Sequence, residues 1–299
     1  MQFLPSVIGS SNGKESILPA DSVFQVRPFL NKLCLEYEHL QHFKKLVFRQ
    51  HPTYAFELIE NVKEDPPDFR IKRGGKIIGL ELTAYTPSTR RKQVAFFGKI
   101  QDQFLQAHRC GALRNLQGVY IELSFKTDDG TPKKVDEKTF VELTQAFSKL
   151  SPRRDKKNRI CSNGGNPYPL GESGETNDGG IGWYVYAVSE TPSYGTALAN
   201  ETGFDINYVY RRWTDSSEVF EELQNRIDAK DHGRNGTEEL LISAGAPSLD
   251  GWVIASESTC MAHCIKEWTG PKAKPKHLKR IFLDIWGADQ LHILYEANQ

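Results

Sequence analysis

The sequence predicts an α/β fold in which helices flank a central mixed β-sheet. Segments with apolar residues at every third or fourth position are typical of amphipathic helices, and segments in which apolar and polar residues alternate are typical of strands. Both kinds occur along the chain without an internal repeat, which indicates a layered domain. The chain has 299 residues, 38% of them hydrophobic, so it is long enough to bury a large core.

The first predicted helix covers residues 29–49. Pro28 suits the first turn of this helix, and the apolar residues that follow recur at three- or four-residue intervals. The same periodicity predicts further helices at residues 89–109, 136–150, 219–230 and 256–268. Alternating or aromatic segments predict strands at residues 53–63, 68–73, 76–85, 119–125, 181–188, 204–213, 239–243 and 281–286. Residues 151–180, which are first basic and then rich in Gly, Asn and Pro, predict a long loop.

The organisation along the chain predicts an N-terminal arm over residues 1–27, rich in Ser, Gly and Pro, followed by a single domain over residues 28–299. Lysine plus arginine equals aspartate plus glutamate at 38 each, which excludes a histone-like coat of positive charge but not a local basic groove. Five scattered cysteines do not resemble a disulfide framework. No stretch approaches the roughly 18 apolar residues of a membrane span. We therefore expect a cytoplasmic protein without a membrane segment.

A β-hairpin is the strongest local signal in the sequence. Gly74-Gly75 separates two alternating segments, and a two-residue Gly-Gly loop is a typical hairpin turn. If these two residues alone form the loop, Arg73 pairs with Lys76, and the same register places Asp68 opposite Glu81. The β-carbons of such a pair lie roughly 4.5–5.5 Å apart.

The alternation along the hairpin predicts one apolar face and one face that carries both acids. Like charges directly opposite each other destabilise a sheet, and a cation between them removes this cost. Oxygen ligands favour a hard ion, so we expect Asp68 and Glu81 to bind Mg²⁺ or Mn²⁺. The alternative is a solvated hairpin with an accidental acid pair that Arg70 and Lys72 partly neutralise.

Pro67-Asp68, followed by Glu81-Leu82-Thr83 on the next strand, resembles the PD-(D/E)XK nuclease superfamily. The resemblance covers residues 28–85 and 215–243, where a helix, the acid-bearing strands, a later helix and another strand follow in similar order. It implies a restriction-endonuclease-like core in which residues 86–214 are an elaboration. It also implies a metal-dependent nuclease that hydrolyses phosphodiester bonds, with DNA as the expected substrate.

The sequence departs from this pattern at Thr83, where the superfamily has a lysine. We expect Lys230 to replace it, because Lys230 follows Ile227 by three residues on the inward face of its helix. The alternative for Lys230 is a cation that complements the helix dipole, and Lys92 and Lys99 are further candidates. Glu36, at the margin of the first helix's apolar stripe, could add a ligand or could be an ordinary, partly exposed glutamate.

A second hypothesis follows from Thr83: a nucleic-acid-binding or interaction protein that keeps the nuclease fold without turnover. A third is an unrelated α/β protein.

Basic clusters at residues 90–92, 153–154, 156–159 and 272–280 are candidate phosphate contacts or solvated surface. Five aromatic residues, which could stack bases or pack two β segments together, are Trp183, Tyr184, Tyr186, Tyr208 and Tyr210. Cys260, His263 and Cys264 lack a second ligand pair for zinc, so we interpret them as helix residues.

Overall fold

The computed structural model of the protein describes residues 7–11, 14–18, 23–25, 28–62, 66–86, 88–125, 136–151, 172–187, 197–209, 214–269 and 272–297. The chain divides into two compact units. Unit 1 contains Met1–Pro19, Pro28–Pro87 and Trp213–Gln299, and unit 2 contains Ala20–Arg27 and Ser88–Arg212. The segment expected as an elaboration, 86–214, thus coincides closely with the larger part of unit 2.

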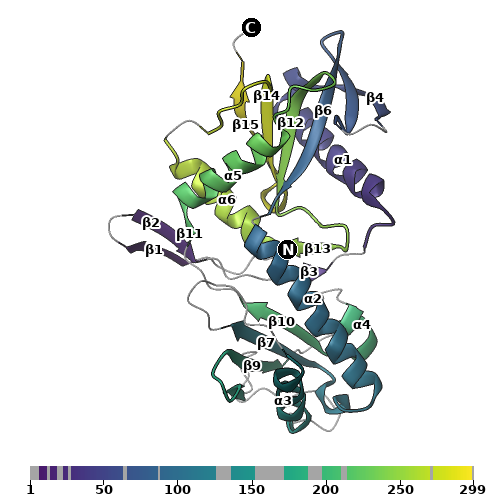
Figure 1. Cartoon of the computed structure of the whole chain (residues 1–299), viewed down its shortest axis with the longest axis vertical. Coiled ribbons are helices and arrows are strands. Elements are labelled where there is room, and N and C mark those ends of the chain that lie inside the picture. Colours follow the sequence, from purple (N-terminus) through teal and green to yellow (C-terminus); the bar gives the residue numbers. More distant parts are fainter. Residues whose placement is uncertain are drawn as a thin grey trace. The chain divides into compact units, whose positions relative to one another are not determined.

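Unit 1 contains a six-stranded mixed sheet with the strand order β15-β14-β12-β6-β5-β4 (Figure 1). Its strands are β4 (Glu57–Asn61), β5 (Phe69–Arg73), β6 (Lys76–Tyr85), β12 (Thr237–Ala244), β14 (Arg280–Ile285) and β15 (Gln290–Glu296). Strand β12 runs parallel to both β6 and β14, while the remaining pairs are antiparallel. The predicted α/β class with a mixed sheet and flanking helices is therefore confirmed.

Helices cover both faces of this sheet (Figure 1). Helix α1 (Lys32–Gln50) begins at Asn31, whose side chain accepts a hydrogen bond from the Cys34 amide, and packs its apolar stripe on one face. Helices α5 (Ser216–Lys230) and α6 (Ala255–Glu267) pack on the other face. Neighbouring side chains of β12 enter the two cores on opposite faces of the sheet. Leu241 belongs to the core beneath α1, and Leu240 belongs to the core beneath α5 and α6.

The hairpin of β5 and β6 has the predicted turn and register. Gly74 and Gly75 have φ angles of +56° and +82°, which glycine adopts without strain. Arg73 pairs with Lys76 and the ladder continues to Phe69 opposite Leu80. Gly79 lies where the backbones approach most closely: a β-carbon there would be 2.8 Å from the Gly236 carbonyl oxygen. The hairpin is thereby fixed against the segment that enters β12.

Unit 1 differs from the sequence expectation in several elements. The predicted surface arm contains the strands β1 (Val7–Ser11) and β2 (Lys14–Leu18), which form a small antiparallel sheet with β11 (Thr214–Asp215). The predicted strand 53–63 begins only at Glu57, because Pro52–Tyr54 forms a 3-10 turn with proline at its start. Strands β13 (Trp252–Ile254) and β15 were not predicted.

Unit 2 contains a four-stranded sheet with the order β10-β7-β9-β8. Its strands and helices are β3 (Val23–Gln25), α2 (Ser88–Arg109), β7 (Val119–Phe125), α3 (Glu137–Ser148), β8 (Ser173–Glu175), β9 (Ile181–Ala187), α4 (Ala197–Thr202) and β10 (Asp205–Val209). The two aromatic β segments do not pair with each other, because β7 lies between them. The Trp183 ring packs edge-on against Phe147, while Tyr184 is about half exposed.

Several sequence features lie outside the described residues: the basic residues 153–159, and the side chains of residues 90–92 and of Tyr186, Tyr208 and Tyr210. Strand β8 falls within the segment that was predicted to be a loop, and α4 was not predicted. Among the helices in the described part of the chain, none combines the length and apolar character that crossing a bilayer requires.

Candidate functional site

Asp68 lies immediately before β5 and is 6% exposed. Its Oδ2 accepts a hydrogen bond of 2.8 Å from the Leu82 amide, at the point where the β5–β6 ladder has ended. The main-chain oxygen of Asp68 accepts from the Val62 amide and from the Asn61 side chain. These contacts fix the carboxylate at the open end of the hairpin, beside the strand that carries Glu81.

Glu81 lies in the middle of β6 on the face that α5 covers, and is 1% exposed. Its Oε1 accepts a hydrogen bond of 2.5 Å from the Lys230 ammonium. Its Oε2 is buried and has no hydrogen-bond partner among the described residues. A carboxylate oxygen buried without a partner is costly, so this atom has the capacity to accept a further cation or donor.

Lys230 is the last residue of α5, and two contacts place it. Four residues earlier on the helix, Arg226 donates a hydrogen bond of 2.7 Å to the Thr86 carbonyl at the end of β6. The helix is thus attached to β6 at two points, Thr86 and Glu81. The Lys230 side chain is 31% exposed and reaches inward, so its place is not explained by the helix dipole alone.

A second lysine and a third carboxylate border the acid pair. Glu36 on α1 is 14% exposed, and its Oε1 lies 2.9 Å from the Lys32 ammonium. The same ammonium lies 3.7 Å from Asp68 Oδ1. The sequence reasoning identified Glu36 but missed Lys32. Its position four residues before Glu36, which places both on one face of the helix, is the signal that could have found it.

The electrostatics of the pair are dominated by burial and by like charge. Burial, followed by the negative charge of Glu81, raises the pKa of Asp68 to about 7. Glu36 raises the Asp68 pKa further, while the Leu82 amide and the Lys32 ammonium lower it. Asp68 therefore lacks sufficient positive charge around it to hold its own charge at the ordinary pKa of an aspartate.

The residues present fit a Mg²⁺ or Mn²⁺ ion held by few protein ligands. Within the described part of the chain, no group of three or more His, Cys, Asp or Glu side chains is close enough to hold an ion without other ligands. Mg²⁺ is commonly bound by one or two carboxylates together with waters and substrate oxygens. The partnerless Oε2 of Glu81 and the raised pKa of Asp68 both favour an added cation.

The remaining candidates are Thr83, Lys99 and Lys92. Thr83 lies two residues after Glu81 on the same strand, is half-buried, and pairs with Ile242 of β12. Lys99 is exposed on α2 in unit 2, and the side chain of Lys92 lies outside the described residues. Of the predicted site residues, the structure brings together Asp68, Glu81, Lys230 and Glu36.

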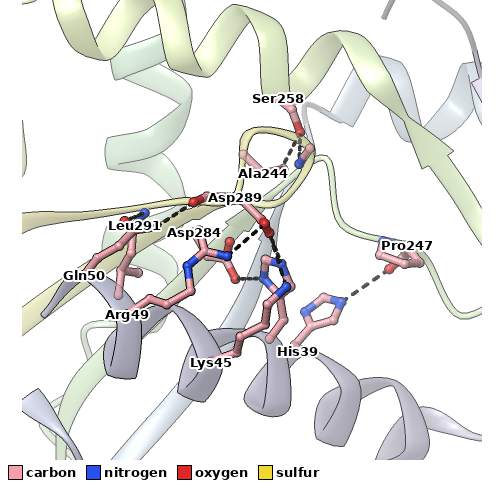
Figure 2. A network of polar contacts seen from close by, with 12 residues as sticks. His39, Lys45, Arg49, Gln50, Ala244, Pro247, Ser258, Asp284, Asp289 and Leu291 are labelled. Carbon is pink, nitrogen blue, oxygen red and sulfur yellow. Dashed lines mark hydrogen bonds and ion pairs between the residues drawn. The ribbon is translucent and has the colours of Figure 1, made fainter. Parts of the chain in front are cut away.

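A second polar network, which sequence reasoning missed, lies at the carboxyl ends of β12 and β14 (Figure 2). His42 on α1 lies between two carboxylates, with Nδ1 2.8 Å from Asp284 and Nε2 3.2 Å from Asp289. Its ring stacks on Trp286 at 3.9 Å. Figure 2 shows Lys45 and Arg49 of the same helix directed toward Asp289, at 3.7 and 3.2 Å.

Both ring nitrogens of His42 face acceptors, so the doubly protonated imidazolium satisfies this geometry. Burial alone would lower the pKa of His42, but the hydrogen bonds and charges of Asp284 and Asp289 outweigh burial and raise it. One ring nitrogen of His39, one turn earlier, lies 3.4 Å from the Pro247 carbonyl oxygen, and burial lowers the pKa of His39 to about 4. We assign the network to fixing α1 on the sheet, because His42 has no nitrogen left for chemistry.

A pocket of about 1150 Å³ opens near the tip of the hairpin, lined by Tyr54, Arg73, Glu239 and Arg280 among others. Its charges neutralise one another: Arg73 and Arg280 both donate to the Glu239 carboxylate, and Arg280 also pairs with Glu296. The Arg73 guanidinium lies 5.3–5.9 Å from three aromatic rings. This cluster is a closed structural unit and offers no unpaired carboxylate to a metal.

No family model, no curated protein and no solved structure matches the chain.

Proposed function

We propose that the protein is a metal-dependent nuclease that hydrolyses phosphodiester bonds in DNA, with a restriction-endonuclease-like core in unit 1. The observation that carries this proposal is the contact between Lys230 and Glu81, beside Asp68. Two carboxylates and a lysine are the chemical groups of the PD-(D/E)XK motif. Here the lysine comes from α5 instead of from position 83.

The order of elements in unit 1 supports the same proposal. Helix α1 is followed by the three strands β4, β5 and β6, and after unit 2 by helix α5 and strand β12. The acids lie on β6 and just before β5, and β12 runs parallel to β6. This is the succession of a helix, acid-bearing strands, a later helix and a further strand on which the resemblance rests.

In this mechanism Asp68 and Glu81 would hold the ion, and Glu36 is a third carboxylate at the border of the cluster. Mg²⁺ or Mn²⁺ supplies Lewis-acid polarisation of the scissile phosphate and a more acidic water. The Lys230 ammonium is held at Glu81 and offers positive charge to the phosphate oxygens as negative charge develops on them. The Leu82 amide keeps the Asp68 carboxylate in place throughout.

The alternative is a nucleic-acid-binding or interaction protein that keeps this fold without turnover. Thr83 is the residue that favours it, since the motif position carries no charge. In that case Lys230 serves only as the partner that makes the burial of Glu81 tolerable. The two functions differ in whether the acid pair is needed for bond cleavage.

A cleavage assay separates them. We expect the wild-type protein to cut DNA with Mg²⁺ or Mn²⁺ and not with EDTA, and Asp68→Asn and Glu81→Gln to reduce the rate by at least about a hundredfold. Asparagine retains an acceptor for the Leu82 amide, so the fold is kept. Glu57→Gln, at an exposed position on β4, is the matched control and should cut like wild type.

Equal cleavage by wild type and both site variants would refute the proposal, and binding of DNA or RNA without cleavage of any form would select the binding protein. Metal binding has its own readout. Mg²⁺ at ten times its Kd should stabilise the wild-type fold by about 1.4 kcal/mol. The Glu81→Gln variant should show a smaller rise in Tm.

A further inference from the structure

The basic segment Lys272–Lys279, between α6 and β14, is held by hydrogen bonds to Gln224 of α5 and to Asp231, the residue that follows α5. The Asp231 carboxylate accepts hydrogen bonds from three consecutive backbone amides, those of Lys276, His277 and Leu278. Gln224 accepts from the Lys274 amide at 3.0 Å and donates to the Lys274 carbonyl at 3.2 Å. The segment is thus a fixed surface and not a loose tether.

Apolar residues attach the same segment to the core. Ala273 is 8% exposed and Leu278 is 4% exposed, and both belong to the core beneath α5 and α6. With these side chains directed inward, the lysines at positions 274 and 276 are exposed. Neither forms an ion pair with any residue that the structure describes. The nearby acids are occupied, because Asp231 accepts backbone amides and Asp228 accepts from Gln224.

The link to the candidate site is a pair of consecutive residues. Lys230 extends to Glu81, and Asp231 holds the basic segment. The end of α5 therefore fixes the position of the segment relative to the acid pair. Helix α5 is also attached to the end of β6 by the hydrogen bond from Arg226 to the Thr86 carbonyl.

We propose that the segment Lys272–Lys279 is the surface on which the phosphodiester backbone of the nucleic acid lies, with Lys274 and Lys276 contacting phosphates. The choice of partner rests on the proposed function. An anionic polymer bound along this segment continues past the end of α5 to the acid pair, where a bond is cut. Unneutralised lysines on a rigid backbone meet regularly spaced phosphates without the entropic cost of ordering a loop.

Binding measured without divalent metal tests this inference independently of cleavage. The full-length protein in EDTA is titrated against labelled DNA and RNA duplexes of one sequence at several KCl concentrations. For Lys274→Gln/Lys276→Gln we expect affinity for DNA to fall at least about tenfold at 0.1 M salt. The slope of log K against log[salt] should decrease by about 1.8, or about 0.9 for each phosphate contact.

The control Lys44→Gln/Lys72→Gln removes two exposed charges from other elements of unit 1 and should leave both quantities near wild type. If both double variants lose DNA affinity equally, the loss reflects only the change in net charge, and the inference is overturned. The inference is also overturned if Lys274→Gln/Lys276→Gln binds DNA like wild type but no longer binds phosphatidylserine vesicles. That result would assign the segment to binding a membrane surface. If no DNA is cut but the lysine pair still lowers DNA affinity, the inference stands and the nuclease proposal fails.

Discussion

Lys230→Met tests the contact on which the proposed function rests. The substitution removes the ammonium but retains a side chain of similar length, and it leaves the Glu81 carboxylate, which is 1% exposed, without its partner. Breaking a buried ion pair from one side costs about 3–5 kcal/mol. Because Lys230 is 31% exposed, solvent screens the pair and we expect the lower end of this range.

A double-mutant cycle separates stability from activity. Glu81→Gln/Lys230→Met has no unpaired charge, so its free energy of unfolding in urea should return to within about 1 kcal/mol of wild type. Its cleavage rate should not return, because one of the two proposed metal ligands and the proposed phosphate-stabilising ammonium are both missing. Lys230→Met alone should lose about 10²–10³-fold in kcat, the usual effect of removing one group that stabilises developing negative charge.

The exposed Lys76 provides the matched control, and Lys76→Met should change neither quantity. If Lys230→Met is destabilised as expected but keeps wild-type turnover, Lys230 is a structural partner of Glu81. The lysine of the mechanism must then come from elsewhere. If it is neither destabilised nor slowed, the contact between Lys230 and Glu81 does not exist in solution.

Two further predictions concern the framework around the site. The raised pKa of His42 means that its interactions with Asp284 and Asp289 stabilise the fold fully below the ordinary histidine pKa, and that this stability is lost as pH rises through the raised value. The difference in unfolding free energy between wild type and His42→Asn should be about 1.5–3 kcal/mol at pH 6 and should shrink toward pH 9. A difference that grows with pH would contradict the stabilising role assigned to protonated His42. Gly79→Ala should lower the free energy of unfolding in urea by about 1–3 kcal/mol, because the new β-carbon would lie 2.8 Å from the Gly236 carbonyl oxygen. A change under about 0.5 kcal/mol would show that the hairpin can move away from β12.

The hairpin could be predicted from sequence because every signal for it is local. A Gly-Gly turn between two alternating segments determines the register, and the register determines which residues face each other. The same reasoning found the inward position of Lys230, which follows from the spacing of apolar residues on α5. Apolar spacing alone does not identify the carboxylate that Lys230 contacts, because Glu81 lies 149 positions away; only the family resemblance pointed to the acid pair.

The features that sequence reasoning missed depend on distant pairing. Strand β15 is recognisable as a strand through its ladder with β14, and β1 and β2 pair with each other and with β11 near residue 214. Such short segments have weak local patterns, and tertiary context decides their structure. The contact between His42 and Asp284 spans 242 positions and leaves no periodic signature.

The motif has a lysine at the position of Thr83, and its absence here does not by itself remove positive charge from the candidate site. Positions 81 and 83 point to the same face of β6, because side chains alternate along a strand. Helix α5 covers this face, and its last residue brings an ammonium to within 2.5 Å of Glu81. The proposed chemistry requires positive charge beside the carboxylates, and Lys230 from the covering helix places an ammonium at Glu81. Thr83 is compatible both with a charge supplied by Lys230 and with a protein without turnover, and the Lys230 cycle distinguishes the two.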